Sequence, residues 1–79
     1  MVFCKIESSS TNSALYHYGD SPSNLTGIVV FYSDSRHYLI PRKPDGCDLL
    51  ERWIAKTRIK YDRYIRIGVF PERMSIQIG

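Results

Sequence analysis

The feature that most constrains the fold is a run of β-branched and aromatic residues followed by a polar turn. Gly27–Tyr32 has the composition of a strand, Ser33–Arg36 is turn-like, and His37–Ile40 is expected to return as the next strand. If Asp34-Ser35 is a two-residue loop, the facing pairs are Tyr32 with His37, Phe31 with Tyr38, and Val30 with Leu39. Both faces of this hairpin are then largely apolar, which predicts a place near the middle of a sheet or a cover on both sides.

Alternating apolar and polar residues predict strands elsewhere in the chain. These are Val2–Glu7, Ala14–Tyr18, Ile65–Phe70 and Met74–Ile78. The last two would form a hairpin around Pro71-Glu72-Arg73, for which a four-residue loop suits the proline. Pro41–Pro44, with two prolines, is expected to lack regular structure. The terminal hairpin would have an open edge, so a homodimer is compatible with the sequence.

A single helix is expected from about Gly46 to Thr57 or beyond. Asp45 suits its N-cap, and Asp48 approximates a capping box. Its apolar stripe consists of Leu50, Trp53, Ile54 and Thr57, with Leu49 on the edge. The end is ambiguous, because Ile59–Asp62 fits either a last helical turn or the start of a strand. The sequence therefore predicts one α+β domain over residues 1–79, an antiparallel sheet of five to six short strands with one helix packed on one face.

Composition and motifs restrict the class of protein. The chain has two cysteines, Cys4 and Cys47, and no CxxC motif or Cys/His cluster, so no metal or other cofactor is expected. Both cysteines are better interpreted as small, buried hydrophobic residues. Cys47 would nevertheless lie at a helix N-terminus, where the pKa of a thiol is lowered. Apolar runs are short, which predicts a cytoplasmic protein with reduced thiols and no membrane partner.

Catalytic residues are not specified by any motif. His37, with Arg36, Tyr38 and Arg42 nearby, would suit acid–base cleavage of RNA only if a second proton-transfer group were present. The alternative is a partly exposed strand histidine, and we expect no enzyme. His17, between two tyrosines, is expected to serve packing or surface contact.

Charge is distributed unevenly along the chain, and this is the clearest functional signal. Residues 35–79 carry ten basic residues against five acidic ones, whereas residues 1–34 carry one against three. The predicted partner-binding residues are Arg52, Lys56, Arg58, Lys60, Tyr61, Arg63, Tyr64 and Arg66. Such a set can neutralise phosphates and stack on bases, or it can dock on an acidic protein. An ordinary solvated helix face, supported by an Asp48–Arg52 pair, is the competing explanation.

Tyrosine is also abundant, with six in 79 residues. So many tyrosines are not all expected to fit a thin core, and exposed tyrosines favour recognition.

The helix segment LERWIAK and the closing segment IGVFPERMSIQIG resemble small phage-encoded anti-CRISPR proteins. The resemblance implies a sheet crossed by one helix and a non-enzymatic inhibitor that occupies nucleic-acid or subunit contacts of a CRISPR effector complex. Many of those proteins are acidic, whereas this chain is basic. A second segment, RHYLIPRKPDGCDLLERWI, is similar to the strand–loop–helix of small toxin ribonucleases, although their glycine–serine–histidine signature is missing. We therefore expect a phage or mobile-element binding protein that modulates a protein or protein–nucleic-acid complex, with direct nucleic-acid binding as the alternative.

Overall fold

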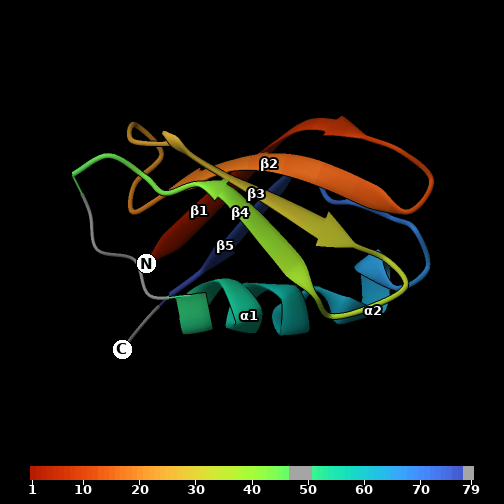
Figure 1. The fold of residues 1–79 in the computed structure, drawn as a ribbon. Helices are drawn as coiled ribbons and strands as arrows, with labels where there is room; N and C mark the ends of the chain where they lie inside the picture. Colours follow the sequence, from red (N-terminus) through yellow and green to blue (C-terminus); the bar gives the residue numbers. More distant parts are fainter. Residues whose placement is uncertain (47–50, 78–79) are drawn as a thin grey trace.

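The fold is a five-stranded antiparallel sheet with two helices on one face, over the residues that the structure describes (Figure 1). The structure is a computed structural model and describes residues 1–46 and 51–77. The strands are β1 (Val2–Ser9), β2 (Ser13–Gly19), β3 (Gly27–Tyr32), β4 (Tyr38–Arg42) and β5 (Arg73–Ile76). The helices are α1 (Glu51–Lys60) and the short α2 (Asp62–Ile65). The expected α+β class is confirmed.

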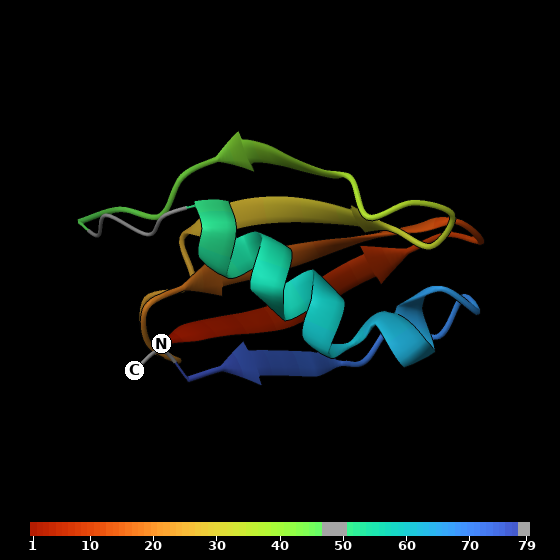
Figure 2. The same ribbon diagram turned by 90° about the horizontal axis from the view of Figure 1, so that it is seen from below.

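The strands lie in the order β4-β3-β2-β1-β5. The first four form a meander, in which each strand pairs with the next along the chain. The chain then passes through α1 and α2 before β5 pairs antiparallel with β1. Seen from the helix side, α1 runs obliquely across the sheet (Figure 2). The helices therefore cover one sheet face, while the other has no helical cover in the described part of the chain.

The core lies between this sheet face and the helices. Alternate residues of the strands point into it, among them Tyr16 and Phe31, whose rings meet edge to face with centroids 5.7 Å apart. The helical layer contributes Ile54, Thr57 and Ile65, all at most 1% exposed. Burial of these side chains removes apolar surface from water, which holds the two layers together. The inward stripe expected for Ile54 and Thr57 is confirmed, and Trp53 beside them is half-buried.

The β3–β4 register was predicted in part. Phe31 pairs with Tyr38 and Val30 with Leu39, as expected, but no Tyr32–His37 pair forms because β4 begins at Tyr38. The expectation that Pro41–Pro44 lacks regular structure was wrong at its first two residues. β4 extends to Arg42 through an irregular register, and Pro41 is tolerated because β4 is an edge strand, which has no neighbour on that side.

The predicted strand at Ile65–Phe70 is wrong. Backbone hydrogen bonds of helical spacing form here instead, from Ile65 N to Tyr61 O at 3.0 Å and from Arg66 N to Asp62 O at 3.0 Å. Gly68 has a φ of 83°, which ends the turn. Ile65 is buried in the core, while the two apolar residues that alternate with polar neighbours after it are exposed. The expected terminal hairpin is therefore not formed, and β5 instead pairs with β1 as an edge strand of the sheet.

The expected N-cap at Asp45 is not formed, whereas the end of the helix agrees with one of the two alternatives. Gly46 has a φ of 69°, so no helix begins there. Asp45 lies in a turn, where its backbone N–H donates to Thr26 Oγ1 at 2.6 Å. The ambiguous end is settled, because α1 continues to Lys60. The predictions for Cys47, Asp48, Leu49, Leu50 and the end of the last strand at Ile78 fall outside the described residues.

Candidate binding surface

Arg58 is the one member of the predicted basic set that lies inside the molecule. Its side chain is 1% exposed, and its guanidinium donates from Nη1 to Asp62 Oδ1 at 2.7 Å. Nη2 donates to the carbonyl oxygens of Tyr32 and Ser35, both at 3.1 Å. The hydrogen bond from Arg58 holds the pKa of Asp62 below its usual value, with further help from nearby positive charges. Arg58 thus joins α1 to the turn after β3, and its assignment as a partner-binding residue is corrected.

Lys60 and Tyr61 lie near the edge strand β5. The Tyr61 hydroxyl donates to Ser75 O at 3.2 Å and accepts from Ser75 N at 3.1 Å. Lys60 Nζ donates to the same carbonyl at 2.7 Å and lies 5.3 Å from the centre of the Tyr61 ring. An edge strand normally presents unpaired backbone groups, and at Ser75 these groups are occupied by side chains. Both residues therefore stabilise the fold at this edge.

The other five predicted residues are exposed on the helical layer. They are Arg52, Lys56, Arg63, Tyr64 and Arg66. The cationic groups of Arg52 and Lys56 lie 5.0 and 4.6 Å from the Trp53 ring centre, a cation–π geometry that orders both side chains. Arg63 lies 5.9 Å from the Tyr64 ring centre.

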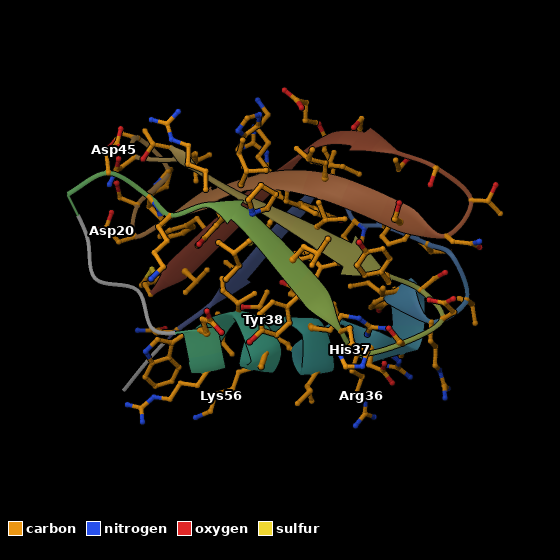
Figure 3. All side chains as sticks on the ribbon, in the orientation of Figure 1. Asp20, Arg36, His37, Tyr38, Asp45 and Lys56 are labelled. Carbon is orange, nitrogen blue, oxygen red and sulfur yellow. The ribbon has the colours of Figure 1, made fainter. Side chains whose placement is uncertain are left out.

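Arg36 joins this surface from the turn between β3 and β4, and sequence reasoning missed it. Its side chain is 67% exposed and lies 3.7 Å from Asp62 Oδ2. In Figure 3, Arg36 and Lys56 both point away from the sheet on the helix side. We call the six residues Arg36, Arg52, Lys56, Arg63, Tyr64 and Arg66 the basic face. Nothing in the local sequence places Arg36 here, because the contact joins segments 26 positions apart.

Exposed apolar side chains occur on α1 and in the segment after α2. Ile59, Ile67 and Val69 are 55%, 70% and 50% exposed, and they lie in or directly after the helices. The acidic side chains of residues 51–69 are only Glu51 and Asp62. Asp62 pairs with Arg58 and with Arg36, whereas the other cations of the basic face have no salt bridge within residues 1–46 and 51–77. Ile59 follows Lys56 by three residues on α1, so this apolar side chain neighbours the basic face on the helix surface.

The expectation that several tyrosines are exposed is largely wrong. Tyr16 and Tyr18 are at most 1% exposed, and only Tyr64, at 45%, is well exposed. The Tyr16 hydroxyl donates to Pro71 O at 2.6 Å, and burial raises its pKa. The Tyr38 hydroxyl donates to Glu51 O at 3.4 Å and ties β4 to α1. Most tyrosines therefore use an apolar ring in the core and a hydroxyl at its border.

The side chains considered for catalysis are dispersed. His37 is exposed, and its ring has no hydrogen bond within residues 1–46 and 51–77. Arg42 pairs with Asp45 at 3.3 Å, away from His37. His17 shares a 2.9 Å hydrogen bond with Glu7 on the sheet face without helices. Cys4 is buried, and burial raises its pKa to about 12, which keeps the thiol protonated at neutral pH.

Neither a metal site nor a membrane span is formed by the residues that the structure describes. No three His, Cys, Asp or Glu side chains in that part gather closely enough to hold a metal ion. No helix there is long and apolar enough to cross a bilayer. Comparisons of the chain with protein-family models, with curated proteins and with solved structures gave no match.

Proposed function

We propose that the chain is a small non-enzymatic binding protein that docks an acidic surface of a protein partner with its basic face. The observation that carries the proposal is the division of the basic residues. Arg58, Lys60 and Tyr61 have structural contacts, whereas the five remaining predicted residues and Arg36 are exposed. Opposite charges steer such surfaces together and suppress wrong partners.

The exposed apolar side chains favour a protein partner over a bare phosphate backbone. Ile59 gains nothing from phosphate contact, but it can be buried beside Lys56 against the apolar part of a protein surface. Arginine and tyrosine, as in Arg63 and Tyr64, are the residue types that contribute most to protein interfaces. Direct nucleic-acid binding uses the same cations and remains the second candidate, supported by the exposed ridge of Arg52 and Lys56.

The biological role follows from the resemblance noted in the sequence. It extends the proposal to a phage or mobile-element protein that inhibits or modulates a partner such as a CRISPR effector complex. A cytoplasmic location is part of this proposal and agrees with a buried, free thiol at Cys4. The ribonuclease alternative receives less support, because the groups it would need around His37 are bonded elsewhere.

Affinity purification from host lysate, with and without nuclease, separates the two candidates. We expect a protein partner to be recovered in both samples, with recovery that declines moderately as salt is raised. Loss of all binding after nuclease, with a steep dependence on salt, would transfer the function to direct nucleic-acid binding. Recovery of no partner under either condition would contradict both.

A further inference from the structure

A hollow on the sheet face opposite the helices has the properties of a ligand site. It measures about 500 Å³, a volume typical of small-molecule pockets. Its lining includes Phe3, Lys5, Pro22, Leu25, Arg73 and Ser75. Phe3 and Lys5 alternate with the buried residues of β1, so they lie on the sheet face that α1 does not cover. The hollow is thus separate from the basic face.

Two parts of the chain form its walls. One is the β1–β5 ribbon, and the other is the loop between β2 and β3, which contributes Pro22 and Leu25. Figure 2 shows this loop at the same end of the molecule as the start of β1 and the end of β5. The loop is fastened at Asn24, whose amide donates to Asp20 Oδ1 at 3.0 Å and to Asp45 O at 3.1 Å. The apolar wall of the hollow is therefore held in place before any ligand binds.

The two positive charges in the hollow lie directly opposite each other. Lys5 and Arg73 are cross-strand partners in the β1–β5 ladder. Like charges in facing positions destabilise a sheet. Neither forms a salt bridge within residues 1–46 and 51–77. Glu7, an acid on the same strand, is hydrogen-bonded to His17. An anion between the two cations would relieve their repulsion.

The composition of the hollow identifies the class of anion. Two cations side by side match the double negative charge of a phosphate monoester better than the single charge of a carboxylate. Phe3 is half-buried beside them and offers a ring for stacking, while Pro22 and Leu25 provide apolar contact. We propose that the hollow binds a nucleotide, with its phosphate between Lys5 and Arg73 and its base against Phe3. The nucleotide is either free or the phosphorylated end of a single strand.

Titration of the ¹⁵N-labelled protein followed by NMR tests the proposal, because it detects weak binding and locates it. The probes are AMP, adenosine, inorganic phosphate and a 5′-phosphorylated oligothymidylate. We expect AMP to produce saturable shifts at residues 3–5, 22–25 and 73–75, and adenosine to bind about tenfold more weakly. Stronger binding of the oligonucleotide at the same residues would assign the site to a strand end.

Matched variants separate local contact from general charge. Lys5→Gln with Arg73→Gln is expected to weaken AMP binding about tenfold or more. Arg52→Gln with Lys56→Gln removes the same charge from the basic face and should leave AMP binding unchanged. Phe3→Leu should weaken AMP several-fold without changing the affinity for inorganic phosphate. Circular dichroism checks that each variant is folded.

Three results would overturn the assignment. They are the absence of saturable shifts with either phosphorylated nucleotide probe, equal affinities for AMP and adenosine, and equal affinities for AMP and inorganic phosphate. Equal loss of AMP binding in the two charge variants would likewise remove the hollow as its location. None of these results depends on a protein partner, so they leave the proposed docking role of the basic face intact.

Discussion

Arg52 and Arg58 lie on the same ten-residue helix and have opposite environments. Arg58 is enclosed between α1, α2 and the turn after β3, where three oxygen acceptors receive its hydrogen bonds. Arg52 is exposed and lies against the Trp53 ring. The comparison shows that a basic stretch of sequence is not itself a basic surface. One side of the helix uses its cation to fasten the fold, and the other leaves cations free for a partner.

The largest expected effect is on stability, at Arg58. Arg58→Met removes the donor to two carbonyls and leaves Asp62 without its main partner, so the free energy of unfolding should fall by about 3 kcal/mol. Arg52→Met should change it by less than about 0.5 kcal/mol. Urea denaturation followed by circular dichroism measures both. Equal stabilities of the two variants would contradict the structural role assigned to Arg58.

A double variant distinguishes two causes of that loss, the unpaired Asp62 carboxylate and the lost hydrogen bonds to the carbonyls. In Arg58→Met with Asp62→Leu, no carboxylate is left uncompensated, so part of the lost stability should return. No recovery at all would mean that the two carbonyl acceptors, and not the ion pair, account for the effect.

The edge of β5 supplies the next largest effect. Tyr61→Phe removes the hydroxyl that bonds both backbone groups of Ser75, and it should lower the unfolding free energy by about 1 kcal/mol. Tyr64→Phe is the matched control, because Tyr64 is exposed, and it should be neutral. The same denaturation assay applies. A neutral Tyr61→Phe would show that Lys60 alone suffices at this edge.

Acid is expected to weaken the fold at Asp62, the carboxylate that Arg58 holds. The folded pKa of Asp62 is lowered from 3.8, mainly by the hydrogen bond from Arg58. The unfolded chain therefore takes up this proton at a higher pH than the folded protein. The resulting stability is present above pH 3.8 and is lost as pH falls through the folded pKa.

Asp62→Asn tests this directly, with Asp34→Asn as a control at an exposed turn. We expect Asp62→Asn to be less stable at neutral pH and to lose less stability between neutral and acidic pH than the parent protein. Denaturation curves at a series of pH values measure the difference. Identical pH slopes in the two variants would contradict the assignment.

The strands β3 and β4 were predicted more accurately from the sequence than the last third of the chain. β3 and two of its β4 pairs were predicted correctly, because β-branched and aromatic residues report locally on a pleated, half-buried surface. Residues 65–70 were wrongly predicted to form a strand, because Ile65, Ile67 and Val69 happen to alternate with other residues at the period of a strand. Only Ile65 is buried, and Gly68 adopts a φ that ends a helical turn. The conformation of this segment is therefore determined by tertiary packing and not by its local hydrophobic pattern.

The binding surface shows the same limit. Exposure of Arg52 and Lys56 follows from helical periodicity and was predictable. The burial of Arg58 had a sequence signal, since it follows Ile54 by four residues and precedes Asp62 by four. The contribution of Arg36 had none, because it depends on how the β3–β4 turn meets α2.

The variant that tests the docking proposal most directly is also the one expected to change stability least. Arg52→Gln with Lys56→Gln should change the unfolding free energy by less than about 0.5 kcal/mol. Arg42→Gln with Lys43→Gln is the matched control, since it removes two exposed charges that lie outside the basic face.

Affinity purification with the parent protein and these two variants, after nuclease treatment, is the decisive measurement. We expect that one protein is captured by the parent and the control and is lost from the Arg52/Lys56 variant. Capture of the same protein by all three in equal amount would contradict a role for the basic face.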